Sequence, residues 1–166
     1  STQTLIPCNM ASAAQQALDQ FEQQHGDIDA YLATHLGYGS VAELHQYFSA
    51  EQVDAAALAI GNLEQGAGFI TGDQTGIGKG RICASIMRYA QQQGKIAIFI
   101  TKDKPLYADM MRDVSDIGMR RFTPFITDSS TEIPLANGAA LKTAGAAKQK
   151  AEMQALMQRG NLGHYS

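Results

Sequence analysis

The stretch that decides the fold is residues 66–81, which read Gly-Ala-Gly-Phe-Ile-Thr-Gly-Asp-Gln-Thr-Gly-Ile-Gly-Lys-Gly-Arg. The apolar run from Gly68 to Thr71 is typical of a short buried strand. A glycine-rich turn follows, and a helical pattern then runs from Lys79 to Gln93 and stops at Gly94. A turn placed between a strand and a helix in this way is the context that a phosphate-binding loop needs.

The chemistry of this turn suits an anion. Glycines let the backbone bend sharply and approach a phosphate without a Cβ collision. Successive backbone N–H groups can then point into one concavity, to which a helix N-terminus adds partial positive charge. Lys79 would reach the β- and γ-phosphates as a compact cation, so it is the candidate catalytic residue. The other expected nucleotide contacts in the turn are Thr75, Gly76, Gly78, Gly80 and Arg81.

The turn departs in two places from the common pattern G-x-x-x-x-G-K-[ST]. The first glycine of that pattern falls at Asp73, with a glycine one residue earlier at Gly72. Gly80 stands where a Ser or Thr hydroxyl normally coordinates Mg²⁺. We therefore expect ATP and Mg²⁺ as cofactors, with the metal held by water, by Thr75 or from outside this chain, and no protein metal site. The alternative is an ordinary glycine-rich turn with an incidental lysine.

Apolar runs and helical patterns alternate after the turn. Residues 95–101, Lys-Ile-Ala-Ile-Phe-Ile-Thr, predict a strand buried on both faces. A helix is expected over 104–117, a shorter third strand over 122–127, a loop over 128–145 and a last helix over 146–159. This order predicts an α/β fold whose parallel strands are joined by right-handed crossovers.

The first 63 residues instead predict helices. The first should run from Asn9 to Gly26 and the fourth should end near Leu63. Capping signals mark the later helix starts, at Asp27, at Ser40 with Glu43, and at Ser49 with Gln52. We expect residues 1–47 to form an N-terminal helical region and residues 48–166 to form the front portion of the nucleotide-binding lobe.

The formal net charge of −3 hides an asymmetry. Residues 1–78 carry nine acidic side chains and no Lys or Arg, whereas all 13 Lys and Arg residues lie at or after Lys79. The asymmetry suggests two faces with different partners, or chance combined with a phosphate site in the second half.

Cys8 and Cys83 form neither a disulfide framework nor a metal site, which favours an intracellular compartment. No apolar run has the length of a membrane-spanning helix.

Residues 66–81 resemble the loop of the strawberry notch-like NTPase domain, a RecA-like domain of the helicase superfamily 2 type. That family carries a Gly-Asp-x-Thr/Ala-Gly-x-Gly-Lys-Gly-Arg loop, so Gly80 is in keeping with it. Residues 49–56 also resemble the helix before the family's loop. A further match is the run from Lys102 to Tyr107 with Asp109, Arg112, Asp113 and Asp116-Ile117-Gly118. The resemblance covers roughly residues 48–120.

The resemblance also suggests roles for individual residues. In helicase-like ATPases a Gln before the loop reads the adenine edge, which points to Gln52, and an aromatic ring such as Phe48 can stack on the base. The alternative is a solvated Gln and a core Phe. Thr101, Lys102 and Lys104 follow the second expected strand, where ligands bind parallel sheets, and are candidate contacts to a nucleic-acid phosphate, or else a solvated loop.

By resemblance, this is the ATP-binding part of a DNA-dependent motor. The low Lys content and the richness in Ala and Gln suggest that it comes from a bacterium or a phage. The family pattern predicts a larger protein, with an acidic Walker B-type motif, a second RecA-like lobe and sometimes a methyltransferase module that this segment lacks. The segment alone is then expected to be inactive. The expected location is the bacterial cytoplasm or a phage virion. The alternatives are a P-loop phosphotransferase, and a structural or interaction module with a vestigial nucleotide loop.

Overall fold

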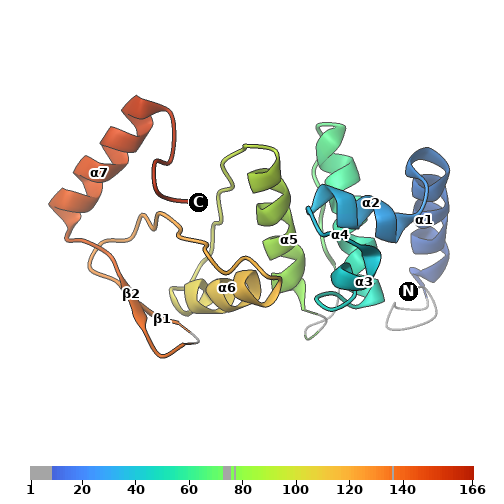
Figure 1. Ribbon diagram of the computed structural model, residues 1–166, viewed down its shortest axis with the longest axis horizontal. Coiled ribbons are helices and arrows are strands. Elements are labelled where there is room, and N and C mark those ends of the chain that lie inside the picture. Colours follow the sequence, from blue (N-terminus) through green and yellow to red (C-terminus); the bar gives the residue numbers. More distant parts are fainter. Residues whose placement is uncertain (1–8, 73–75, 77, 136) are drawn as a thin grey trace. The chain divides into compact units, whose positions relative to one another are not determined.

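The computed structural model describes residues 9–72, 76, 78–135 and 137–166 (Figure 1). The chain divides into two compact units, of which one ends at Lys95 and the other begins at Ile96. The boundary expected between residues 47 and 48 stays a prediction. Among the described residues, no helix combines the length and the hydropathy that crossing a bilayer requires.

The first unit is built from helices α1 (Ala11–His25), α2 (Ile28–His35), α3 (Val41–Leu44), α4 (Ala50–Glu64) and α5 (Lys79–Gln92). The capping residues expected from the sequence are confirmed. The Asp27 carboxylate accepts the N–H of Ala30 at 2.8 Å, and the Ser40 hydroxyl accepts the N–H of Glu43 at 3.1 Å. Gly26 ends α1 in a conformation with a φ of 81° that favours glycine. These helix boundaries follow from local sequence signals.

The core of the first unit lies around α4, which contacts α1, α2 and α5. Leu32, Leu36, Leu44 and Ile60 are completely buried there. Burying each of these side chains stabilises the fold by about 1.5–3 kcal/mol. The α4 helix is therefore the element against which the helix that follows the glycine-rich turn is positioned.

Gly61 allows α1 to approach α4 closely. A Cβ at this position would lie 2.6 Å from Cε2 of Phe21, a separation that real Cβ contacts do not show. Phe21 is itself buried. Packing therefore explains a glycine in the interior of α4, where intrinsic helix propensity disfavours it.

The second unit contains α6 (Pro105–Asp116), β1 (Glu132–Pro134), β2 (Ala140–Lys142) and α7 (Ala146–Arg159). The two strands form an antiparallel hairpin in which Ile133 pairs with Leu141. Ile133 is buried, and so are Val114, Ile117 and Leu156 of the same unit. The two expected helices are confirmed. The loop expected over residues 128–145 is wrong, because this stretch holds the hairpin.

The expected parallel sheet is not confirmed. In the part of the chain that the structure describes, the paired strands are β1 and β2, and residues 68–71, 95–101 and 122–127 contain no strand. Ile98 and Ile100 are 81% and 86% exposed. A β-branched run forms a stable strand only where neighbouring strands supply hydrogen bonds and cover its faces. The described residues provide no such cover here.

We expect Gly61→Ala to destabilise the first unit by about 1–3 kcal/mol, the cost of overpacking a core, although Ala is the better helix former. In a Phe21→Leu background the same change should cost less, because the shorter side chain removes the colliding ring atom. Urea unfolding of the two single variants and the double variant measures this coupling. An equal cost of Gly61→Ala in both backgrounds would exclude the collision as its cause.

Candidate nucleotide-binding site

The glycine-rich turn leads directly into α5. Gly76 and Gly78 have φ values of 99° and 84°, which glycine adopts readily, and Lys79 is the first residue of the helix. Backbone turned in this way before a helix N-terminus is the arrangement that attracts a phosphate. The contact expected from Thr75 lies outside the described residues.

Gln52 lies against the end of this turn. Its side chain is 7% exposed, and a Cβ on Gly78 would collide with its Nε2 atom. Its Oε1 atom accepts the backbone N–H of Ser49 at 3.1 Å, in the capping box that begins α4. The structure thus brings together two residues that the sequence singled out separately. That Gln52 reads adenine stays a prediction.

Phe48 lies in the helical core. It is 5% exposed, and its ring packs edge-on to Tyr38 with centroids 6.2 Å apart. Tyr47 stacks on the same tyrosine at 5.3 Å. This placement matches the alternative of a core phenylalanine, and stacking of Phe48 on adenine stays a prediction.

Arg81 directs one nitrogen of its guanidinium to the helical region. Its Nη1 donates to the carbonyl oxygen of Tyr47 at 2.8 Å. Gly80 lies in the first turn of α5 and has no hydroxyl for a metal. Within the described ranges, no group of three or more His, Cys, Asp and Glu side chains could hold a metal ion.

The residues expected to contact nucleic acid lie in the second unit. Thr101 is half-buried and Lys102 is exposed. Lys104 precedes α6, and its Nζ donates to Oγ1 of Thr131 at 3.0 Å. Lys104 is thus bonded within its own unit, and the contact of all three residues with DNA stays a prediction.

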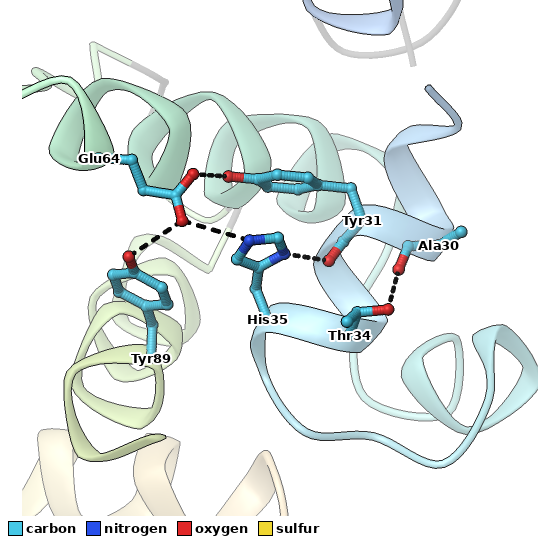
Figure 2. A network of polar contacts seen from close by, with 6 residues as sticks. All are labelled: Ala30, Tyr31, Thr34, His35, Glu64 and Tyr89. Atoms are coloured by element: carbon cyan, nitrogen blue, oxygen red, sulfur yellow. Dashed lines mark hydrogen bonds and ion pairs between the residues drawn. The ribbon is translucent and has the colours of Figure 1, made fainter. Parts of the chain in front are cut away.

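A polar cluster that the sequence did not indicate joins α2, α4 and α5 (Figure 2). We name it the Glu64 cluster, and its members are Tyr31, His35, Glu64 and Tyr89. The Tyr31 hydroxyl donates to Oε2 of Glu64 at 2.7 Å, and the Tyr89 hydroxyl donates to Oε1 at 3.2 Å. Nε2 of His35 lies 3.2 Å from Oε1, and its Nδ1 lies 2.7 Å from the carbonyl oxygen of Tyr31. A carboxylate at the end of α4 therefore connects two other helices.

The cluster stabilises the charge of Glu64. Burial opposes ionisation of this carboxyl, but hydrogen bonds from Tyr31 and Tyr89 and the nearby charges of His35 and His25 outweigh burial and lower its pKa below 4.5. Burial and the hydrogen bond to Glu64 raise the pKa of Tyr31. Burial and the charge of Glu64 raise the pKa of Tyr89. Both phenols therefore keep the protons that they donate to the carboxylate.

Arg88 makes a second contact between α5 and the earlier helices that the sequence did not indicate. Its Nε donates to the carbonyl oxygen of Leu36 at 2.6 Å. Its guanidinium carbon lies 4.0 Å from the centre of the Tyr38 ring, a cation–π distance. Burial raises the pKa of Tyr38 to about 12, although the charge of Arg88 opposes this shift. The ring is therefore neutral beside the guanidinium.

Local sequence patterns do not predict these contacts, because the partners are far apart in the chain. Glu64 and Tyr89 are separated by 25 residues, and Leu36 and Arg88 by 52. The one local signal is the i,i+4 spacing of Tyr31 and His35, which places both side chains on the same face of α2.

The sequence profile of the family described as P-loop containing NTP hydrolase pore-1 matches residues 13–152. The chain belongs to this family. The matched range includes the glycine-rich turn, Lys79 and most of both units, so P-loop NTP hydrolase membership supports nucleotide binding by this chain. No curated protein and no solved structure matches the chain.

We expect the Glu64 cluster to make the stability of the first unit depend on pH on the acid side. Folding lowers the pKa of Glu64, so its charge contributes stability above pH 4.5 and this contribution is lost as the pH falls through the lower folded-state pKa. Urea unfolding of the native protein and of Glu64→Gln, between about pH 7 and about pH 3, measures the contribution. The difference in unfolding free energy between the native protein and Glu64→Gln should be largest near neutral pH and should decrease in acid.

The control for this measurement is Glu22→Gln, which changes an exposed carboxylate on α1. The difference in unfolding free energy between the native protein and Glu22→Gln should stay small at every pH, as for most exposed substitutions. A Glu64→Gln gap that is independent of pH would contradict the stabilising role of the charge.

Proposed function

We propose that this chain is the ATP-binding part of a helicase-like, DNA-dependent ATPase. The observation that carries the proposal is the position of Lys79, which opens α5 directly after the left-handed Gly78 in a chain of the P-loop NTP hydrolase family. A lysine at a helix N-terminus beside turned backbone is suited to the β- and γ-phosphates of a nucleotide.

Two observations on the described residues support a nucleotide at this turn. Apart from its chain neighbours, no described atom lies within 4 Å of a Cβ built on Gly76. Gln52 packs against Gly78, which supports a role for its amide near the nucleotide. A bound Mg²⁺ would spread the negative charge of the β- and γ-phosphates. In our proposal Lys79 holds those phosphates, and the turn with Gly80 supplies backbone N–H groups.

We further propose that residues 68–71, 95–101 and 122–127 are strands of a parallel RecA-like sheet in the complete protein. Ile96, Ile98 and Ile100 recur with the period of a strand and are 54%, 81% and 86% exposed. Covering apolar surface of this kind stabilises a protein by about 25 cal/mol per Å². Slow amide hydrogen exchange of residues 96–100 in the complete protein would support the sheet, and fast exchange would contradict it.

The DNA-dependent part of the proposal rests on the resemblance and on Thr101, Lys102 and Lys104. We propose that a second RecA-like lobe, and in some proteins a methyltransferase module, completes the motor in the bacterial cytoplasm or in a phage particle. ATP hydrolysis that DNA stimulates would support the motor. Phosphate transfer to a small molecule without a DNA effect would instead indicate a phosphotransferase, and failure to bind ATP with Mg²⁺ a structural module.

Lys79→Ala should raise the Kd of ATP at least about 10-fold, because a hydrogen bond to a charged group contributes about 1.5–3 kcal/mol. Isothermal titration with ATP and Mg²⁺ measures the change. Lys95→Ala is the matched control, since this exposed lysine follows the other end of α5. Unchanged ATP affinity in Lys79→Ala would contradict the assignment of Lys79 as a phosphate-binding residue.

Lys102→Ala should weaken DNA binding by the complete protein and lower the slope of log K against log salt by about one, as the loss of one phosphate contact does. Fluorescence anisotropy at several salt concentrations measures both. Lys142→Ala serves as the control, because this lysine lies 3.2 Å from Glu132 across the hairpin. Equal slopes in native and Lys102→Ala proteins would argue against a phosphate contact at this residue.

A further inference from the structure

We propose that one face of α5 fixes the end of the nucleotide loop to the helical region, so that nucleotide affinity depends on contacts remote from the phosphates. The face is formed by Gly78, Arg81, Arg88 and Tyr89, and we name it the α5 seam. The inference rests on the proposed nucleotide-binding function and assigns positioning roles to Arg88 and Tyr89.

The spacing of the seam places its members on one side of the helix. Arg88 and Tyr89 lie seven and eight residues after Arg81, about two turns further along α5, and Gly78 is the N-cap residue of the helix. Ser85 lies between the two arginines, is completely buried and bonds its hydroxyl to the carbonyl of Ile82 at 2.7 Å. A small, internally satisfied side chain at this point is compatible with close approach of α5 to the earlier helices.

Each member of the seam contacts a different point of the helical region. Gly78 lies against the Gln52 side chain, and Arg81 donates to the Tyr47 carbonyl. Arg88 donates to the Leu36 carbonyl and lies over the Tyr38 ring. Tyr89 donates to the Glu64 carboxylate. Contacts that are spread along almost the whole of α5 restrain both its position and its rotation. Because Lys79 opens this helix, the restraint extends to the residue that faces the nucleotide.

The chemistry of the two arginine contacts explains why they form here. Leu36 is the C-cap residue of α2, where backbone carbonyls carry partial negative charge that a cation stabilises. Residues 1–78 contain His but no Lys or Arg, so the helical region needs later residues for a permanently charged cation. Arg81 and Arg88 meet this need from α5.

Replacing Arg88 distinguishes an effect on the position of α5 from the loss of a direct contact with the nucleotide. It lies nine residues after Lys79 in the sequence, which corresponds to about 13 Å along a helix. Its guanidinium is directed to Leu36 and Tyr38. A loss of nucleotide affinity on replacing Arg88 therefore cannot arise from a lost contact with phosphate.

The test compares Arg88→Gln and Tyr89→Phe with the matched control Tyr31→Phe, in the complete protein. Tyr31→Phe removes the other hydroxyl that Glu64 accepts but leaves α5 unchanged. Well below the unfolding temperature, Arg88→Gln should weaken binding of a fluorescent ATP analogue about threefold or more, and Tyr89→Phe by a smaller factor. Tyr31→Phe should lower the melting temperature without changing this affinity.

A second readout needs no nucleotide. Amides of residues 79–84 should exchange hydrogen faster in Arg88→Gln than in Tyr31→Phe, because only the first variant loosens the start of α5. Wild-type affinity in a folded Arg88→Gln protein overturns the proposal, and so does an equal loss of affinity in Tyr31→Phe. If Arg88→Gln does not fold, Tyr89→Phe decides by the same criteria. If the native protein binds no nucleotide, the proposed function fails, and the exchange comparison alone supports or overturns the seam.

Discussion

One carboxylate, that of Glu64, connects three helices of the first unit. It ends α4, the helix on which α1, α2 and α5 pack, and it receives hydrogen bonds from Tyr31 of α2 and Tyr89 of α5. Moving a carboxylate away from water is costly unless donors surround it. The hydroxyls and the imidazole of His35 provide such surroundings. Within this arrangement, the Tyr89 hydrogen bond joins α4 to α5, the helix that begins at Lys79.

The charge asymmetry of the sequence has a structural counterpart in the first unit. With no Lys or Arg before Lys79, acidic side chains of the helical region meet other partners. Asp27 accepts a backbone N–H at a helix start, and Asp29 lies 3.3 Å from Nε2 of His45. The arginines of α5 bind backbone carbonyls of the helical region and stack on one of its rings. The cationic helix and the acidic region therefore form one packed unit.

Local signals predicted helices well and strands poorly. The caps at Asp27 and Ser40 depend on residues at most four positions apart, so the sequence contains all that is needed. The hairpin was missed although Asn137-Gly138 is a common hairpin signal, because the surrounding Ser, Thr, Gly and Ala residues resemble a loop. The apolar run of residues 95–101 predicted a strand, but a strand also requires a neighbour, which no local pattern can guarantee.

The sequence by itself determined the positions of the helices, the glycine-rich turn and the lysine that begins α5, because each depends on neighbouring residues and on the conformational freedom of glycine. It also singled out Gln52. Only the tertiary structure decided that Gln52 packs against Gly78, that Arg88 binds the end of α2, and that Glu64 joins α2 to α5. These contacts join residues between 25 and 52 positions apart. They exist because burial of the apolar faces around α4 brings the helices together, and polar side chains between them must then find partners.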